Sequence, residues 1–477
     1  MKIKKIVKSL FLTAPLFTIS FYLSGYIAQF IRNYQIWSYS GAFADDGSAP
    51  VFPSPKVIDC FSAAIEFPYG LYGFGICFLC FSVIVLLLRS KGPREGKCDR
   101  ERNFSYSESG IYGTSGFMDK KTMESLFEVT NDLKHTKGII LGQLDDGRVV
   151  CLPENTKMNK HIAVYGASGS MKSRAFSRNM IFQTVRREES LVIVDPKGEL
   201  YNDMSIYLRD NGYTVKVFNL VSPENSDSWD CLGEIRGEEL MAQTFTDVVI
   251  KNTGGQRGDL FWDRGETNLL KALALYVQLS YAPGKRVMSE AYKLITNKSM
   301  DTLDMLFAKL PPTHPAKAPY AIFSQASDTV RTGIVIGLGS RLQIFQNQQI
   351  CEITSHNEID LEMLGKEKTA LFVINSDQDS TFDWLASLFF SFLFIRLVRY
   401  ADKFGDNGEL PVPVNIIGDE WLNIGTILDF PRRLSVIRSR NLNMTGIIFQ
   451  SIGQLQNRYP ENQWSEVLGN CDTQLFL

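Results

Sequence analysis

The sequence has almost no net charge and few histidines, and these scarcities argue against several classes of protein. Lys and Arg number 50 against 52 Asp and Glu in 477 residues, so the formal net charge is −2 and excludes a chain-wide basic surface for nucleic acid. The four histidines stand apart in the sequence and predict no histidine-based chemistry. No HExxH motif occurs, which argues against a membrane metalloprotease, and no LSGGQ-like segment occurs, which argues against an ABC transporter.

Cysteine is also scarce in the patterns that metal or redox chemistry needs. The eight cysteines do not form the two CxxC pairs of a zinc site. Cys77 and Cys80 are three residues apart but lie in an apolar run, which favours small apolar residues of a hydrophobic helix over a redox motif. The cysteines beyond residue 90 fit a reduced cytosolic body.

The sequence does contain two long uncharged apolar runs near its start, residues 10–31 and 67–88. Each has 22 residues, enough at a rise of about 1.5 Å per residue to cross a hydrocarbon core of about 30 Å. Basic residues flank the outer end of each run, whereas the segment between them, 32–66, carries four acidic and only two basic residues. By the positive-inside rule we predict a multi-pass protein of the cell (inner, cytoplasmic) membrane, anchored by a transmembrane hairpin with both ends in the cytoplasm.

A cleaved signal peptide is the alternative for the first run. A lysine-rich start and Ala42-Phe43-Ala44 before Asp45 resemble one. The run is long for the apolar part of a signal peptide, however, and a second run follows it. The membrane hairpin therefore remains the prediction.

After the membrane segment the apolar pattern indicates an α/β fold. Residues 91–160 are polar and broken by glycine, and they predict a connector with a small leading β unit. From His161 onward, short apolar runs alternate with helix-like periodicity, which is typical of a parallel sheet covered on both faces. The predicted strands are 162–165, 191–194, 215–220, 369–374, 414–417 and 443–449.

Residues 237–349 interrupt this alternation with helix-like periodicity and few β-rich runs. We therefore predict a mainly helical insertion within the α/β domain. The predicted division of the chain is a transmembrane hairpin at 1–90, a connector and β unit at 91–160, an α/β domain at 161–236 and 350–477, and the insertion at 237–349.

The segment GASGSMKS follows a predicted strand directly and precedes a predicted helix. It matches the phosphate-binding pattern GxxxxGK[ST] except at Met171, where the second glycine would stand. In such a loop backbone N–H groups face the phosphates, Lys172 reaches the β- and γ-phosphates, and Ser173 binds Mg²⁺. A left-handed backbone at Met171 would cost about 1–3 kcal/mol, part of which Gly169 would absorb. The predicted nucleotide contacts are Gly166, Ala167, Ser168, Gly169, Ser170, Met171, Lys172 and Ser173.

Two further strand ends carry the polar residues that an ATPase requires. The strand 414–417 is followed by Asp419 and Glu420, as in a Walker B motif, where Asp419 would bind Mg²⁺ and Glu420 would activate the attacking water. Gln450 ends the next strand and would sense the γ-phosphate. Each feature alone also fits an ordinary strand end in solvent. Together with the loop they predict a RecA-like P-loop NTPase core that binds ATP and Mg²⁺ and hydrolyses ATP.

The order of these motifs resembles the coupling proteins of type IV secretion, the TraG-like conjugative DNA transfer ATPases of mobile elements. The resemblance covers nearly the whole chain, including YGTSGF at 112–117, and DPKGELY at 195–201 is its most specific motif. Its other parts are the two-helix anchor, the P-loop, the helical insertion, DEWLNIG at 419–425 and IRSRN at 437–441 with the IIFQS that follows. A branch of the family from Gram-positive elements carries GASGSMKS itself, which implies that Met171 is a branch variant.

The resemblance implies a homo-hexameric motor with ATP at the subunit interfaces and an arginine supplied by the neighbouring subunit. Arg438 and Arg440 are the candidates, and for each the alternative is a solvated helix end or a structural ion pair. The substrate implied is single-stranded DNA attached to a relaxase, bound through its backbone and passed to the secretion channel. The ATPase body would lie in the cytoplasm, and the helical insertion would select cargo.

Two other functions fit parts of the sequence. An FtsK-type double-stranded DNA translocase shares the plan of anchor and motor, but DPKGELY and the two-span anchor favour the conjugative family. A docking receptor that binds cargo without hydrolysing ATP is compatible with Met171. It is also compatible with an end at Leu477. Chains of the family usually continue further, so we expect this sequence to be a fragment or a truncated copy.

Overall fold

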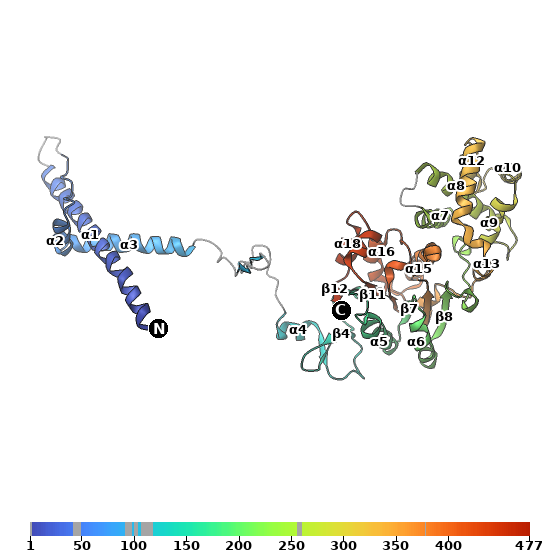
Figure 1. The fold of residues 1–477 in the computed structure, drawn as a ribbon, viewed down its shortest axis with the longest axis horizontal. Helices are drawn as coiled ribbons and strands as arrows, with labels where there is room; N and C mark the ends of the chain where they lie inside the picture. Colours follow the sequence, from blue (N-terminus) through green and yellow to red (C-terminus); the bar gives the residue numbers. More distant parts are fainter. Residues whose placement is uncertain are drawn as a thin grey trace. The chain divides into compact units, whose positions relative to one another are not determined.

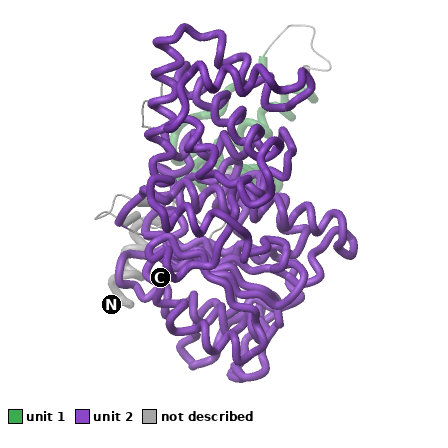
Figure 2. Tube along the Cα trace, turned by 90° about the vertical axis from the view of Figure 1, so that its right-hand side faces the viewer, with its two compact units in different colours: residues 1–117 green, residues 118–477 purple. Residues whose placement is uncertain are grey.

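The computed structural model forms two compact units, residues 1–117 and 118–477, coloured separately in Figure 2 and described separately here. The predicted family segment YGTSGF at 112–117 lies outside the described residues. The structure describes residues 2–41, 49–90, 98–99, 104–105, 118–254, 260–376 and 378–477.

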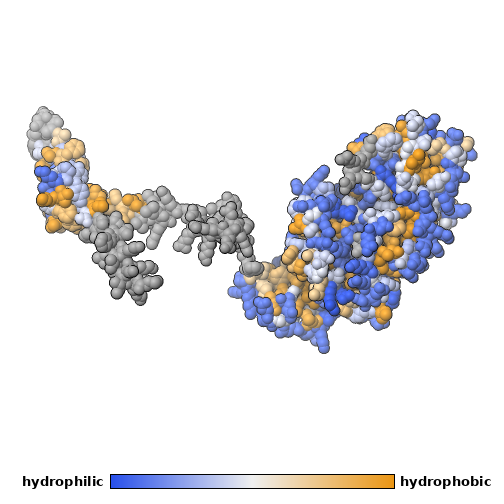
Figure 3. Space-filling model, viewed as in Figure 1, coloured by the Kyte–Doolittle hydropathy of each residue, from blue (hydrophilic) through white to orange (hydrophobic). Residues whose placement is uncertain are grey.

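The first unit contains three helices that pack on one another. α1 includes the whole predicted span 10–31, and α3 includes the predicted span 67–88 except its first two residues. Large apolar side chains of this unit are exposed, among them Ile58 at 82% and Phe78 at 73%, and Figure 3 shows hydrophobic residues over its surface. The elements are α1 (Lys2–Gly41), α2 (Val57–Ile65), α3 (Tyr69–Ser90) and the short pair β1 (Cys98–Asp99) and β2 (Phe104–Ser105).

Glycines allow the three helices to approach closely. A Cβ atom added at Gly25 would lie 1.7 Å from the Cys60 carbonyl oxygen, and one added at Gly73 would lie 2.1 Å from the Ser24 carbonyl oxygen. Contacts of this kind between small residues are typical of helices that pack in membranes, where no hydrophobic driving force holds helices together.

Among the described residues, one helix is by itself long and apolar enough to cross a membrane, and it lies in the second unit. It is the segment Ser380–Phe404, and 78% of its most apolar stretch of 18 residues is buried inside the protein. In the first unit, α2 and α3 meet the same criterion only as a pair, with a bend of 100° between them. The two-span hairpin therefore stays a prediction.

A seven-stranded parallel sheet forms the centre of the second unit. Its strand order is β12-β6-β11-β10-β7-β9-β8, and every neighbouring pair is parallel. The predicted α/β class with a mainly parallel sheet is confirmed, and each predicted strand agrees with an observed one to within one residue at either end. The strands are β6 (Ile162–Tyr165), β7 (Ser190–Val194), β8 (Thr214–Asn219), β9 (Thr369–Ile374), β10 (Val414–Gly418), β11 (Leu442–Phe449) and β12 (Thr473–Phe476).

The central strands are buried along their whole length and largely apolar, because both faces of the sheet are covered there. In β7, Leu191 and Ile193 belong to a core with α5 (Arg178–Arg186) and α6 (Glu199–Asp210), whereas Val192 and Val194 belong to the core on the opposite face. Figure 1 shows α5 and α6 on one side of the strands and α15 and α16 on the other. Successive side chains of a strand point to opposite faces, so a doubly covered strand reads as one continuous apolar run.

A three-stranded antiparallel sheet precedes the large sheet in the sequence. It lies within residues 91–160, where a small leading β unit was predicted. Its order is β3-β5-β4, and Ile139 and Leu152 pack into the core of α5 and α6. Its elements are α4 (Lys120–Leu126), β3 (Glu128–Thr130), β4 (Ile139–Gln143) and β5 (Val149–Leu152).

All regular elements described between β8 and β9 are helical. Figure 1 shows α8, α9, α10 and α12 gathered at one end of the unit, and α7 and α8 share a hydrophobic core with α15. The longer helices there are α7 (Glu239–Thr253), α8 (Leu260–Ser280), α9 (Met288–Asn297), α10 (Met300–Ala308), α11 (Lys317–Ser324), α12 (Asp328–Arg341), α13 (Gln348–Ile353) and α14 (Met363–Lys366). After β9 follow α15 (Asp383–Phe404), α16 (Phe430–Ile437), α17 (Ile452–Arg458) and α18 (Gln463–Gly469).

The 22-residue helix α15 lies in the middle of the larger core. Its Arg396 is 3% exposed, and the Nε atom donates to Glu234 Oε2 at 2.6 Å. Trp229 Nε1 donates to the other carboxylate oxygen of Glu234 at 3.3 Å. The buried charge is therefore both paired and hydrogen-bonded, as a charge in an apolar core must be.

We expect the buried His161, directly before β6, to make the stability of the second unit depend on pH. Its Nδ1 accepts from the Met444 N–H at 3.0 Å and its Nε2 lies 3.1 Å from the Leu434 carbonyl oxygen, so the ring is neutral. Burial lowers its pKa from 6.5 to about 4. The unfolded chain then binds the proton more readily, and stability falls as the pH falls through this range.

Between pH 7 and pH 4.5, the free energy of unfolding should drop by about 2–3 kcal/mol more in the wild type than in His161→Gln. Urea unfolding at the two pH values measures this difference, with the exposed His135→Gln as the matched control. An equal pH dependence in wild type and His161→Gln would contradict the prediction.

Candidate nucleotide site

Four neighbouring strands bring their carboxyl ends to one edge of the sheet. β6, β11, β10 and β7 follow one another in it, and the register pairs Tyr165 with Phe449 and Val194 with Gly418. In a parallel sheet, residues that follow neighbouring strands are themselves neighbours. The polar segments predicted to act together therefore meet at this edge, although they lie far apart in the sequence.

The loop from Gly166 to Ser173 turns through two left-handed residues. φ is +83° at Gly169 and +60° at Met171, so the strained backbone considered for Met171 is present. The Met171 side chain is 65% exposed and does not fill the loop. The N–H groups of Ala167 and Ser168 donate to no group among the described residues, which leaves them available to an anion.

Two side chains of the loop indicate where a phosphate fits. The Lys172 ammonium is buried and donates to the carbonyl oxygens of Gly166 at 2.9 Å and Ala167 at 3.1 Å. Ser170 Oγ is buried with no hydrogen-bond partner among the described residues. A buried hydroxyl without a partner is uncommon in proteins. The loop therefore offers a free donor and a movable cation to phosphate oxygens.

Ser173 and Asp419 meet in the structure, as the predicted magnesium site requires. Ser173 Oγ donates to Asp419 Oδ2, and the Asp419 N–H donates to the Val194 carbonyl at 3.2 Å. Burial raises the pKa of Asp419, and this rise is opposed by the hydrogen bond from Ser173 and by the ammonium groups of Lys172 and Lys197. Hydroxyl and carboxylate oxygens are ligands that Mg²⁺ prefers, so the pair fits this metal.

Within the part of the chain that the structure describes, no group of three or more His, Cys, Asp or Glu side chains is arranged to hold a metal ion. Mg²⁺ commonly takes only one or two protein ligands and completes its shell with phosphate oxygens and water. Metal binding at Ser173 and Asp419 would therefore depend on the nucleotide.

Glu420 and Gln450 also lie together. Gln450 Nε2 donates to Glu420 Oε1 at 3.2 Å, and the Gln450 N–H donates to Gln454 Oε1 at 3.0 Å. Glu420 has a φ of +53°, a left-handed conformation that is uncommon outside glycine and recurs at functional sites. The Gln450 amide is thus hydrogen-bonded to the Glu420 carboxylate. The catalytic roles of both residues stay predictions.

A cavity of about 390 Å³ connects these groups. Five of the predicted site residues line it: Ser168, Ser173, Asp419, Glu420 and Gln450. The cavity is also lined by residues that were not predicted as site residues, among them Arg178, Asp195, Lys197, Asn423 and Gln454.

Asp195 could have been found from the sequence, because it directly follows an apolar strand, as Asp419 does. Asp195 is 3% exposed. Burial raises its pKa to about 6, with a smaller contribution from Asp419, and hydrogen bonds from the N–H groups of Tyr201 and Leu200 oppose the rise. Perturbed carboxyl groups that line a cavity are typical of functional sites.

Arg438 and Arg440 are not at this edge of the sheet. They lie in the short 3₁₀ helix Arg438–Arg440 directly before β11, and thus at the amino ends of the strands. Arg440 pairs with Asp402 at 3.0 Å, and Arg438 donates to the Lys157 carbonyl at 3.2 Å. They do not contribute to the site of their own chain, and a role toward a neighbouring subunit stays a prediction.

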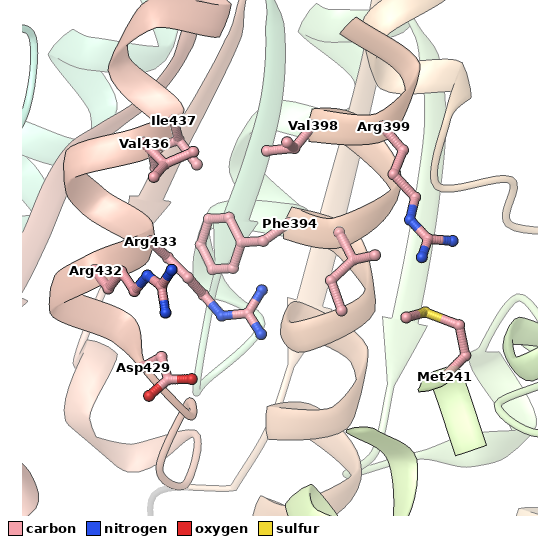
Figure 4. A pocket seen from close by; sticks show the side chains of 10 residues that line it. Met241, Phe394, Val398, Arg399, Asp429, Arg432, Arg433, Val436 and Ile437 are labelled. Atoms are coloured by element: carbon pink, nitrogen blue, oxygen red, sulfur yellow. The ribbon is translucent and has the colours of Figure 1, made fainter. Parts of the chain in front are cut away.

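A second cavity of about 350 Å³ lies between α15 and α16 and is shown in Figure 4. Its walls are largely apolar, with Arg399, Arg432 and Arg433 among the lining residues, and Arg433 Nε donates to the Leu428 carbonyl at 2.9 Å. None of the predicted site residues lines it, and it shares no residue with the cavity at the strand ends. It is therefore separate from the candidate nucleotide site.

Met171→Gly should leave the nucleotide loop functional. We expect the free energy of unfolding to change by less than about 1 kcal/mol, since relief of the left-handed strain offsets the larger backbone entropy of glycine in the unfolded chain. Affinity for a non-hydrolysable ATP analogue should stay within about twofold, as the exposed side chain leaves the loop free. Met171→Val should lose both stability and affinity, because β-branched residues fit this conformation poorly.

Urea unfolding and fluorescence titration measure the two quantities. A large loss of affinity in a folded Met171→Gly chain would show that the methionine side chain itself contributes to binding.

The comparisons with known proteins agree with this geometry. A family model described as type IV secretory system conjugative DNA transfer matches residues 114–477. No curated protein matches the chain.

Among solved structures, the chain is similar to the plasmid coupling protein TrwB in complex with the non-hydrolysable ATP analogue ADPNP. The TM-score is 0.56 at 15% identity, over 75% of this chain and 77% of that chain. TrwB in complex with ADP and Mg²⁺ gives a TM-score of 0.54 at 15% identity, over 76% of this chain and 80% of that chain. At such low identity the likeness concerns the fold alone, and it confirms the predicted RecA-like fold of the core.

The family model covers the whole second unit with its strand-end motifs, so the resemblance predicted from those motifs is confirmed. The chain belongs to the type IV secretory system family of conjugative DNA transfer.

Proposed function

We propose that the chain is a membrane-anchored ATPase that couples a DNA–relaxase substrate to a type IV secretion channel and drives conjugative DNA transfer. One observation carries the proposal: the phosphate loop, the Ser173–Asp419 pair and the Glu420–Gln450 pair converge on one cavity. ATP and Mg²⁺ as ligands are supported by TrwB structures with ADPNP and with ADP and Mg²⁺.

Nucleotide binding begins with Lys172. Its ammonium group exchanges the carbonyl oxygens of Gly166 and Ala167 for oxygens of the β- and γ-phosphates, while the loop N–H groups and Ser170 Oγ donate to the phosphate chain. Mg²⁺ held by Ser173 and Asp419 would neutralise charge that develops on the transferred phosphoryl group.

Hydrolysis depends on Glu420, which accepts a proton from the attacking water. Gln450 donates to one carboxylate oxygen of Glu420 and leaves the other oxygen for the water. Arg438 or Arg440 of an adjacent subunit in a homo-hexamer supplies the positive charge that stabilises the γ-phosphate.

The first unit anchors the motor in the membrane. Its exposed apolar side chains and its glycine-mediated helix contacts support this role, because contiguous exposed apolar surface of this extent is rare in soluble monomers. The second unit then lies in the cytoplasm, where its helical segment at 237–349 selects cargo and the α/β domain at 161–236 and 350–477 hydrolyses ATP. Single-stranded DNA is bound through its backbone.

Glu420→Gln should abolish turnover without abolishing binding. We expect kcat for ATP, measured on the full chain in detergent micelles, to fall by about 100-fold or more, because general-base catalysis contributes about that much. Affinity for ADPNP should stay within about threefold, since the phosphate contacts are unchanged. Glu352→Gln, an exposed carboxylate on α13, is the matched control and should keep wild-type turnover.

Single-stranded DNA should stimulate the wild type, and Lys172→Ala should lose both binding and turnover. Stimulation by double-stranded DNA alone would favour a double-stranded DNA translocase. ADPNP binding without turnover in the wild type would favour a docking receptor.

The membrane hairpin predicts opposite exposure for two introduced cysteines. A membrane-impermeant maleimide should label Phe52→Cys in intact cells but label Asp145→Cys only after lysis, because position 52 lies between the two runs and position 145 in the cytoplasmic unit. The parent chain provides the background labelling. Labelling of Asp145→Cys in intact cells would overturn the topology.

A further inference from the structure

The DPKGELY segment forms one wall of the nucleotide cavity, and the mechanism above does not use it. Asp195, Lys197 and Glu199 line the cavity on the side of β7, and Ser168 and Ser173 line it on the side of the phosphate loop. β7 and β6 are separated in the sheet by β10 and β11. The segment therefore faces the phosphate loop across the ends of the two intervening strands.

The segment is a tightly held turn. The Asp195 carbonyl accepts from the Gly198 N–H at 3.2 Å, and Asp195 Oδ2 accepts from the Tyr201 N–H at 2.8 Å. Gly198 has a φ of +69°, and the Tyr201 ring packs edge-on against Phe372 at a centroid distance of 5.3 Å. The turn thus fixes the backbone of Lys197, which stands at its tip.

The positive charge of Lys197 has no partner in the described part of the chain. Among the described residues its ammonium group forms no ion pair and no hydrogen bond, and the side chain is exposed at the cavity. It lies near enough to Asp419 to oppose the burial-driven rise in the pKa of that carboxyl. Lys172, in contrast, is already held by two loop carbonyls.

The position of Lys197 indicates which phosphate it meets. A nucleotide held by the phosphate loop extends its phosphate chain from Lys172 toward the metal ligands Ser173 and Asp419. Lys197 lies in the turn that follows β7, the strand next to β10, and so beyond Asp419 as seen from the phosphate loop. We expect a cation there to reach the last phosphate of a triphosphate, a group that ADP lacks.

We propose that Lys197 contacts the terminal phosphate of bound ATP, that Asp195 positions Lys197 by holding the turn, and that the site thereby distinguishes ATP from ADP. This inference rests on the proposed function. Lys197 is a binding residue in it, and Asp195 is a positioning residue that acts through Lys197.

Equilibrium binding of ADPNP and of ADP to the full chain in detergent micelles, each with Mg²⁺, tests the proposal. Lys197→Ala should weaken ADPNP binding by about tenfold or more, as expected for the loss of a charge-assisted hydrogen bond, and change ADP binding by less than about twofold. Lys197→Arg should restore most of the preference for ADPNP. Lys298→Ala, an exposed lysine at the end of α9, controls for the loss of one positive charge.

Asp195→Ala should lower the ratio of ADPNP to ADP affinity toward that of Lys197→Ala. The double variant should show no further loss, because two residues that act through one contact are not additive. An additive loss would mean that Asp195 does not act through Lys197.

The outcomes separate this inference from the proposed function. If the wild type binds neither nucleotide, or Lys172→Ala does not weaken binding, the proposed ATPase fails. If binding depends on Lys172 but Lys197→Ala leaves both affinities unchanged or lowers them equally, only the role of Lys197 is overturned.

Discussion

The parallel pairing of β10 with β7 on one side and β11 on the other is the constraint on which the site depends. Because both faces of these strands are buried, the first residues that reach the cavity are those directly after the strand ends. The hydrogen bond from the Asp419 N–H to the Val194 carbonyl carries the pairing one residue past β10 and fixes the carboxylate beside Asp195. A shift of one residue in this register would exchange the two faces of the strand and move Asp419 away from Ser173.

The same edge also carries features that cost stability. Met171 and Glu420 are left-handed without being glycine, and Asp195 and Asp419 are carboxyl groups whose pKa values are raised by burial. Each left-handed residue costs about 1–2 kcal/mol, and such costs persist only where the surrounding structure over-determines the conformation. Here the two hydrophobic cores on either face of the sheet provide that support. Bound Mg²⁺ at Asp419 would stabilise the charged form of that carboxyl group.

The sequence predicts the strands well because most of them are short, largely apolar runs between polar or glycine-containing segments. The pairs Ser173–Asp419 and Glu420–Gln450 follow from strand ends in a parallel sheet. Asp195 follows an apolar strand and could have been found in the same way. That Asp195 and Lys197 join this site depends on β7 lying next to β10, and strand order is not encoded in any one segment. A helix was expected between β9 and β10, but the bounds of α15 were not predicted, because its buried residues occupy nearly every face and leave no period of 3.6 residues. The left-handed Met171 was anticipated from the loop pattern, but its outward side chain required the structure.

The apolar composition of α15 has a consequence for the synthesis of the protein. Two apolar runs at the start of the chain are proposed to enter the bilayer, and α15 is a later helix that is also long and apolar enough to cross a membrane. Arg396, near the middle of α15, opposes its insertion, since an arginine at the centre of a membrane helix costs about 2.5–3.5 kcal/mol. In the folded core that charge is matched by Glu234, which the chain places on a distant segment. Arg396 thus disfavours the lipid as a location for α15, and the ion pair with Glu234 accommodates the same charge in the protein interior.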